Sequence, residues 1–364
     1  MAELEALVGL DDVKTQVKKI LSVMRTNMAR RELGLPEEDY SLHFVFTGSP
    51  GTGKTTVARI MAKLLHGVGY LEKNLCVETD ANGLIGQYVG HTGPKTEELI
   101  KKAMGGVLFI DEAYMLRVKA NSQGFEGEAI ATLLRNMENL RGKFVVIIAG
   151  YTKEMEETVQ SNSGLKSRFT KFMELPDYST AESSAIMYRM FKDKKYDASA
   201  EFMANVSLLI ELIKQKEKGD YANGRTVRNY KQETIEQIAL QMTDDAPTYE
   251  SLTKLKVGYL PFGNLKISRA DIDNSKLRWT EKLDGKERTY SYEEICKRDV
   301  KEPFPDLTAE SIEYLKGVLP KDSKKISPEE AQRMLEELSR KLQEGMEPES
   351  GENTEPSVTE PTVH

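Results

Sequence analysis

The stretch from Gly48 to Thr55 constrains the fold more than any other part of this 364-residue chain. A continuous apolar run at 42–47 precedes it and predicts a buried strand, while apolar residues three and four positions apart at 55–65 predict a following helix. The stretch fits the GxxxxGKT pattern, in which glycines let backbone N–H groups turn toward phosphate oxygens. Its residues are Gly48, Ser49, Pro50, Gly51, Thr52, Gly53, Lys54 and Thr55. With both flanking elements in place, the pattern predicts a P-loop rather than a chance glycine-rich turn.

A second motif supplies the acidic groups that hydrolysis of a bound nucleotide needs. The apolar run at 106–110 predicts a strand, and Asp111 and Glu112 follow it directly. We expect Asp111 and the Thr55 hydroxyl to face Mg²⁺ and Glu112 to face the attacking water, because adjacent side chains on a strand point to opposite sides. Lys54 would reach the β- and γ-phosphates, and the nucleotide contacts would continue to Thr56. The two motifs together predict hydrolysis of ATP with Mg²⁺ rather than binding alone.

The apolar pattern predicts an α/β domain over residues 1–176. Helical spacing at 13–32 and at 126–140 alternates with apolar runs at 106–110 and 144–149. Runs without alternation are typical of central parallel strands that helices cover on both faces.

The rest of the chain is predicted to be mainly helical. Residues 177–275 would form a small helical domain, with helices at 179–191, 199–218 and 226–242. Residues 276–344 would form a partly helical C-terminal extension, and the acidic tail at 345–364 cannot bury enough apolar surface to fold.

Three shorter signals lie in this second half. Residues 265–272 suggest a short strand that turns into a capped helix. Thr308 is placed to begin a helix, and Ser327 begins a capping box with Pro328 at the first helical position.

Composition excludes several classes of protein. The formal net charge of -7 disfavours a general nucleic-acid binder, which needs surplus Lys and Arg to neutralise phosphates. Cys76 and Cys296, the two cysteines, lie far apart, which argues against a disulfide framework and a zinc site. No signal peptide or membrane-spanning run is apparent, so we expect no membrane partner and a cytoplasmic location.

Four short stretches together resemble the CbbX and stage V sporulation protein K family of AAA+ ATPases. They are Leu7 to Leu10, the P-loop, Gly105 to Tyr114, and Ala149 to Tyr151. The resemblance covers about residues 1–275. It implies an AAA+ P-loop fold with a helical lid after the α/β domain. It also implies a ring, usually a hexamer, that holds ATP between neighbouring subunits and acts on a protein client through a central pore.

The resemblance also implies roles for two arginines. Arg168, within the segment Asn162 to Phe169, is similar to the family's arginine finger and would reach the γ-phosphate of the next subunit, with Lys166 as a nearby competitor. Arg225, within Asn223 to Asn229, is similar to the lid's second sensor, with Arg228 as the alternative.

The resemblance also suggests roles for several other residues, and a second interpretation stays open for most of them. Tyr151 occupies the place of a first sensor, or it only packs. Val8 and Gly9 would contact adenine, or they belong to a hydrophobic turn against the core. Tyr88 and Val89, flanked by Gly86 and Gly90, resemble a pore loop that grips polypeptide, although Tyr88 could instead be a core residue. A second pore loop is suggested at 117–127.

We therefore predict an ATP-driven protein remodeller. A nucleic-acid motor or loader and a nucleotide-controlled scaffold without turnover are the alternatives. The negative charge and the aromatic loop disfavour the first alternative, and the set of Lys54, Asp111, Glu112 and Arg168 disfavours the second.

Overall fold

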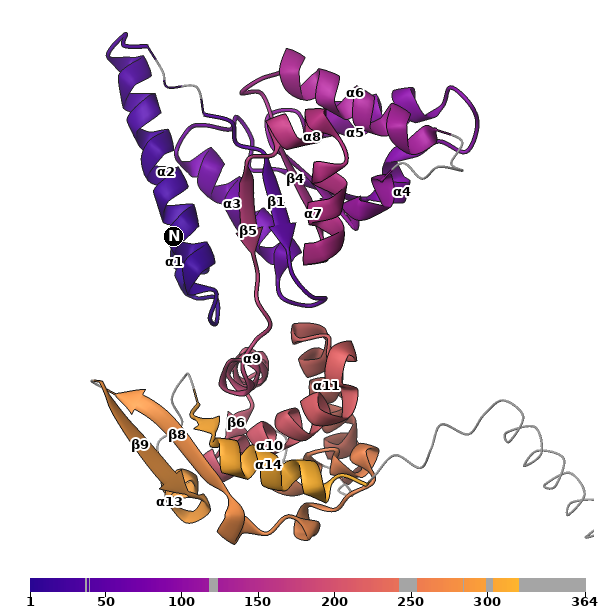
Figure 1. Cartoon of the computed structure of the whole chain (residues 1–364). Helices are drawn as coiled ribbons and strands as arrows, with labels where there is room; N and C mark the ends of the chain where they lie inside the picture. The colour runs from indigo at the N-terminus through magenta and orange to yellow at the C-terminus, as the bar shows by residue number, and fades with distance from the viewer. Residues whose placement is uncertain are drawn as a thin grey trace, which may run out of the picture. The chain divides into compact units, whose positions relative to one another are not determined.

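A five-stranded parallel sheet organises the first half of the molecule (Figure 1). The computed structural model describes residues 1–36, 38, 40–117, 124–241, 254–283, 285–298 and 304–320. The strands stand in the order β2-β3-β4-β1-β5. Their bounds are β1 Phe44–Thr47, β2 Cys76–Asp80, β3 Val107–Asp111, β4 Val145–Gly150 and β5 Lys171–Glu174. Because all strands run in parallel, the loops after β1, β3 and β4 emerge at one edge of the sheet.

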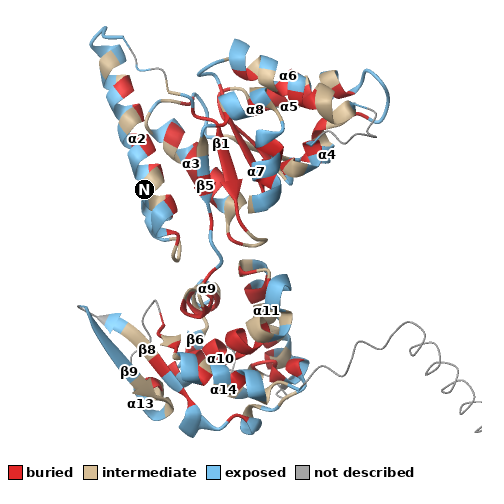
Figure 2. Ribbon diagram, viewed as in Figure 1, coloured by how far each residue is buried: buried red, intermediate tan, exposed pale blue. Residues whose placement is uncertain are grey.

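The central strands are buried on both faces, as their continuous apolar runs predict (Figure 2). Along β1, Phe44 and Phe46 face one core and Val45 faces the other. The first core is covered by α1 Ala2–Glu5, α2 Asp11–Glu32 and α3 Lys54–Gly67. The second is covered by α4 Ala81–Leu84, α5 Thr92–Ala103, η1 Ala113–Leu116, α6 Phe125–Asn139, α7 Thr152–Gln160 and α8 Ser163–Arg168. The predicted α/β fold with helices on both faces is thereby confirmed.

The helical part that follows is built around one buried helix. This helix, α10 Ala200–Glu217, is buried over most of its circumference. It packs between α9 Thr180–Lys192 and the residues that come after α11 Gly224–Gln241. Short elements complete this part: β6 Asp197–Ala198, η2 Lys218–Asp220, β7 Lys254–Leu255, η3 Val257–Tyr259, η4 Phe262–Leu265, η5 Arg269–Asp271 and η6 Asn274–Lys276.

The C-terminal segment, residues 278–318, contributes to the same core as α10. It forms a hairpin of β8 Arg278–Leu283 and β9 Lys286–Ser291, then α13 Tyr292–Lys297, β10 Asp306–Leu307 and α14 Ala309–Val318. Strand β10 pairs antiparallel with β8. Trp279, Phe304, Leu307 and Leu315 are buried in one hydrophobic cluster with Phe202 of α10. This segment therefore helps to hold α10 in place.

One local prediction was right in part and another was confirmed. Of the short strand and the capped helix predicted at 265–272, the strand is absent, because the N–H of Ser268 donates to the carboxylate of Asp271 and is not available to a neighbouring strand. The capped helix is present as the 3₁₀ turn Arg269–Asp271, with Ser268 as its cap. Thr308 does cap a helix, accepting from the N–H of Ser311. The predicted helix at Ser327 and the predicted tail at 345–364 lie outside the described residues. Within the described part, no helix has both the length and the apolarity that a bilayer crossing requires.

Candidate nucleotide-binding site

A cavity of about 730 Å³ lies at the edge of the sheet where β1, β3 and β4 end. The predicted site residues that line it are Val8, Gly48, Pro50, Gly51, Gly53, Lys54, Thr55, Thr56, Asp111, Glu112, Tyr151, Arg225 and Arg228. These residues come from the P-loop, two strand ends, the N-terminal loop and α11. The fold thus brings together, in one cavity, residues that lie up to 220 positions apart along the chain.

Three glycines give the P-loop its shape. Gly48, Gly51 and Gly53 have φ angles of 139°, 75° and 99°, where other L-residues are strained. A Cβ atom on Gly48 would lie 2.2 Å from the carbonyl oxygen of Leu175, and one on Gly51 would lie 2.1 Å from that of Ala222. The loop can therefore keep this path only with glycine at these positions.

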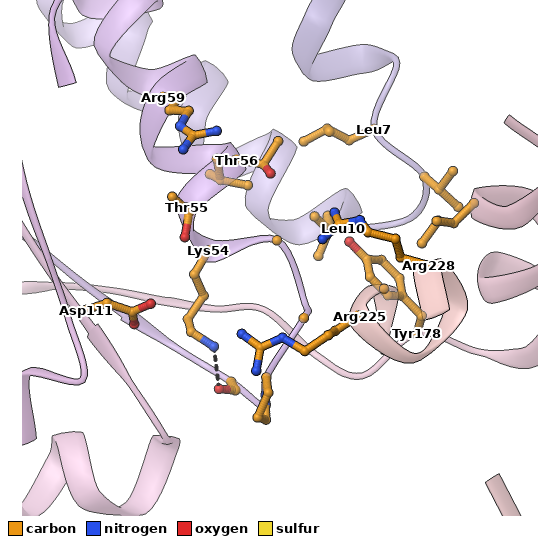
Figure 3. A pocket seen from close by; sticks show the side chains of 18 of the residues that line it. Leu7, Leu10, Lys54, Thr55, Thr56, Arg59, Asp111, Tyr178, Arg225 and Arg228 are labelled. Atoms are coloured by element: carbon orange, nitrogen blue, oxygen red, sulfur yellow. Dashed lines mark hydrogen bonds between the residues drawn. The ribbon is translucent and has the colours of Figure 1, made fainter. Parts of the chain in front are cut away.

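Lys54 lies folded over the P-loop (Figure 3). Its Nζ donates to the carbonyl oxygens of Gly48 and Ser49, both at 2.8 Å. Burial lowers the pKa of Lys54, and the negative charge of Asp111 acts in the opposite direction. Helix α3 begins at Lys54 without a side-chain cap, so its first N–H groups remain available to an anion.

The residues after β3 and β4 form the opposite wall. Glu112 has a φ angle of 50°, and its N–H donates to Oδ1 of Asp111 at 3.0 Å. Tyr151 follows β4, and its ring lies 5.7 Å from that of Tyr114. Tyr151 is 42% exposed and also lines the cavity, so it both packs and faces the site. Asp111 and Glu112 both line the cavity at the turn that follows β3.

Hard oxygen ligands suited to Mg²⁺ are present in the same cavity. The hydroxyl of Thr55 and the carboxylate of Asp111 both line it, next to the uncapped N-terminus of α3. Magnesium prefers such oxygen atoms, completed by phosphate and water. The donor set therefore fits this ion.

The helical part of the chain supplies the remaining wall. Arg225 extends from α11 toward the amine of Lys54, whereas Arg228 lies nearer Leu10 (Figure 3). Both arginines line the cavity. The positive charge of Arg225 contributes to lowering the pKa of Lys54, in agreement with this arrangement.

Sequence reasoning missed the residues that attach this wall to the P-loop. The hydroxyl of Tyr178 donates to the carbonyl of Thr52 at 3.0 Å, and the N–H of Gly224 donates to that of Gly51 at 3.1 Å. Asn223 is fully buried and donates to Asp177 Oδ1 at 2.8 Å. Asn directly before Gly at a helix start was an available signal, since Asn is enriched at positive φ and Asn223 has a φ angle of 48°.

The N-terminal loop closes the far end of the cavity. Leu7, Val8 and Leu10 line it together with Ile186 and Met190 of α9, giving an apolar end suited to a base. Gly9 does not line the cavity, because it lies against Glu182. Two P-loop residues, Ser49 and Thr52, also lie outside the lining, and Thr52 donates its hydroxyl to the carbonyl of Ser49.

Arg168 lies outside the cavity of its own chain. It is the last residue of α8, and its guanidinium forms an ion pair with Glu138 of α6. The hydroxyl of Ser41 donates to its carbonyl oxygen at 3.3 Å. Lys166, its competitor on the same helix, is exposed.

Tyr88 and Val89 are exposed, at 66% and 86%. The alternative that Tyr88 is a core residue is therefore wrong. The Tyr88 ring rests edge-on against His91, 5.4 Å away, and Gly90 has a φ angle of 80° with open space around it. Most of the second suggested pore loop, 118–123, falls outside the described residues.

Two regions of the chain match known protein families. Residues 44–177 match the ATPase family associated with various cellular activities (AAA), and residues 179–278 match the AAA lid domain. Residues 179–278 are therefore called the lid.

Three relatives illustrate what the chain is similar to. Protein CbbX of Cereibacter sphaeroides is 45% identical, over 61% of this chain and 72% of the relative. Chloroplastic ribulose bisphosphate carboxylase/oxygenase activase of Cyanidioschyzon merolae is 43% identical, over 61% and 75%. Stage V sporulation protein K of Bacillus subtilis is 39% identical, over 66% and 74%.

Proposed function

The chain belongs to the AAA ATPases, among the relatives of CbbX and stage V sporulation protein K, and from this membership we propose that it is a ring-forming motor that remodels a protein client. The observation that carries the proposal is the location of Arg168. It lies outside the cavity that holds Lys54, Asp111 and Glu112, so it is available to a neighbouring copy. A site that each subunit completes for the next needs head-to-tail contacts, which can close into a ring, and we propose the hexamer that is usual in this family.

The residues of the cavity divide the chemistry among them. Lys54 leaves the carbonyls of Gly48 and Ser49 to neutralise the β- and γ-phosphates of ATP. Glu112 orients and deprotonates the attacking water, and Tyr151 limits the volume that this water can occupy. Mg²⁺, when held by Thr55 and Asp111, offsets negative charge on the phosphate oxygens.

Arginines from two subunits complete the site. Arg225 of the lid binds the phosphates of its own chain, so that lid position follows nucleotide state, and Arg228 is the substitute for this role. Arg168 of the neighbour stabilises the charge that develops in the transition state. To do so it exchanges Glu138 for the phosphate.

A protein client is proposed for two reasons. The exposed Tyr88 and Val89 offer apolar contact on a glycine-flanked loop, which suits a polypeptide better than a phosphate backbone. The Cyanidioschyzon merolae relative is named as an activase of ribulose bisphosphate carboxylase/oxygenase, itself a protein. The formal charge of -7 further disfavours nucleic acid.

Substitution of the base tests the motor itself. Glu112→Gln keeps the size and the hydrogen-bonding oxygen but cannot accept a proton, so we expect nucleotide affinity to be kept and phosphate release to fall roughly 10²- to 10⁴-fold. Glu98→Gln, at an exposed position on α5, is the matched control and should hydrolyse ATP like the wild type. Wild-type turnover by Glu112→Gln would refute the assigned base.

The client class is tested by stimulation. We expect an unfolded protein, but not single-stranded DNA, to raise the rate of phosphate release by the wild type and to lose this effect in Tyr88→Ala. Stimulation by DNA alone would favour the nucleic-acid motor instead.

A further inference from the structure

Residues 177–181, called here the hinge segment, comprise the end of the connection from β5 and the first two residues of α9, and they are bonded to the P-loop. The hydroxyl of Tyr178 donates to the carbonyl of Thr52 at 3.0 Å. Its N–H donates to Oδ1 of Asn223 at 2.9 Å, and Asn223 in turn donates to Asp177 at 2.8 Å. A change in the P-loop therefore reaches the hinge segment through direct hydrogen bonds.

On its other side the hinge segment is bonded to α10. Nζ of Lys214 donates to the carbonyl of Tyr178 at 2.7 Å, and the hydroxyl of Thr180 donates to the carboxylate of Glu211 at 2.6 Å. Because α10 is the buried centre of the lid, these bonds attach the hinge segment to the core of the lid.

A third attachment comes from far along the chain. The N–H of Ala181 donates to Oδ1 of Asp306 at 2.7 Å, across 125 positions of sequence. Ala181 is in the first turn of α9, where N–H groups lack a partner within the helix. Ser179 caps only the N–H of Glu182, so Asp306 supplies the acceptor that the local cap does not, and its negative charge suits a helix N-terminus.

The position of Asp306 is set by the C-terminal segment. Asp306 and Leu307 form β10, and they pair with Thr280 and Trp279 of β8. Leu307, Trp279 and Phe304 are at most 4% exposed. The Asp306 carboxylate therefore moves with the core of this segment and not as a free surface side chain.

We propose that Asp306 is a positioning residue through which the C-terminal segment controls how firmly the hinge segment holds the P-loop, and hence the affinity for nucleotide. The proposal rests on the proposed function, because it requires nucleotide in the cavity. Most of the segment lies beyond the lid match, which ends at residue 278. Since coupling between two sites is reciprocal, nucleotide must equally change the C-terminal segment, and a partner bound to that segment must change nucleotide affinity.

Three variants distinguish a specific effect on nucleotide affinity from a general loss of protein stability. Asp306→Ala removes the acceptor, and we expect the Kd for a fluorescent ADP analogue to rise roughly five- to tenfold. Asp306→Asn keeps an acceptor oxygen and should bind within about twofold of the wild type. Glu294→Ala is the matched control, because Glu294 accepts from the N–H of Ser291 in the same segment, at 2.8 Å, without touching the hinge segment. It should bind nucleotide like the wild type.

A measurement on the unaltered protein covers the case in which Asp306→Ala does not fold. Amide hydrogen exchange is followed with and without ADP, and we expect ADP to slow exchange in peptides spanning 304–310 severalfold while leaving 286–298 unchanged. Unchanged exchange at 304–310 would overturn the inference. So would wild-type affinity in folded Asp306→Ala, or an equal loss in Glu294→Ala. Failure of the wild type to bind nucleotide would instead overturn the proposed function, and this inference with it.

Discussion

At Gly51 the backbone of the P-loop contacts the backbone of the lid. Its φ angle of 75° already favours glycine, and its carbonyl accepts the N–H of Gly224 at 3.1 Å. A Cβ atom here would lie 2.1 Å from the carbonyl oxygen of Ala222 and 2.8 Å from the nitrogen of Arg225. The backbones at Gly51 and at residues 222–225 could make room for a Cβ atom only if the lid moved away from the P-loop.

We expect Gly51→Ala to weaken nucleotide binding at least about tenfold, because it combines a clash with strain of about 1 kcal/mol at positive φ. Gly34→Ala is the control, since Gly34 has a φ angle of 70° and no atom within 4 Å of its Cβ position. Gly34→Ala should be destabilised only by the backbone strain and should bind nucleotide with wild-type affinity. Equal nucleotide affinities, measured by titration with a fluorescent analogue, would contradict the assignment of this contact.

His43 links the stability of the α/β domain to pH. Its ring lies between those of Phe144 and Phe169, and its Nδ1 accepts the N–H of Val146 at 3.0 Å. Burial, and then the charges of Arg168 and Arg141, lower its pKa from 6.5 to about 4. The unfolded chain therefore binds a proton below pH 6.5 that the folded protein resists until about pH 4.

The protein therefore becomes less stable as the pH falls, because the unfolded chain binds the proton more readily than the folded protein. The contribution of His43 to stability is complete above pH 6.5 and is lost as pH falls from 6.5 toward 4, by about 2–3 kcal/mol. His43→Asn keeps an acceptor for Val146 but does not titrate, so its stability should fall less over this range. Urea unfolding at several pH values measures the difference, and parallel curves for both proteins would rule out His43 as the cause.

At the scale of elements, the C-terminal segment acts as part of the lid core. Trp279 of β8 is fully buried, and its indole N–H donates to the hydroxyl of Ser207 on α10 at 2.9 Å. A buried aromatic residue with a satisfied N–H contributes both packing and a hydrogen bond. The hairpin and α10 should therefore unfold together.

Trp279→Phe should destabilise the protein by about 1–3 kcal/mol, because it leaves a cavity and removes the bond to Ser207. Circular dichroism during urea unfolding measures the loss. Thr289→Ala, at an exposed position on the neighbouring strand β9, should change stability by less than about 0.5 kcal/mol. A Trp279→Phe protein as stable as the wild type would show that the segment folds apart from α10.

Elements with a regular pattern of apolar residues were the ones that the sequence predicted well. The apolar runs of β1, β3 and β4 marked central strands, and helical spacing marked α2, α3, α6 and α9 to α11. Strands β2 and β5 were missed because edge strands mix exposed charged residues, such as Glu78 and Glu174, with residues that are partly or fully buried. The hairpin β8–β9 was missed for the same reason, since β9 is largely exposed.

The candidate site divides in a similar way. The P-loop and the pair Asp111 and Glu112 are local motifs, so spacing alone located them. Tyr178 and Asn223 act through bonds to residues 126 and 173 positions away, and Asp306 bonds across 125. Such contacts depend on the whole fold and leave no local pattern.

At the scale of the whole molecule, the proposed ring separates the parts of one active site between two chains. In this proposal Glu112 would act within its own subunit, whereas Arg168 would act on the neighbour. Arg168→Ala should therefore keep nucleotide affinity but lose roughly 10³-fold in turnover, because the finger contacts only the transition state of the next subunit.

Two inactive variants should then restore each other. When Arg168→Ala and Glu112→Gln are mixed in equal amounts and allowed to exchange subunits, about a quarter of the interfaces join an intact Glu112 to an intact Arg168. Phosphate release should rise toward that fraction of the wild-type rate. Lys166→Ala tests the competing residue. If Arg168 is the finger, Lys166→Ala alone should hydrolyse ATP like the wild type and should need no partner variant in the mixture. A mixture that stays as inactive as its components would exclude a finger supplied from the neighbouring chain.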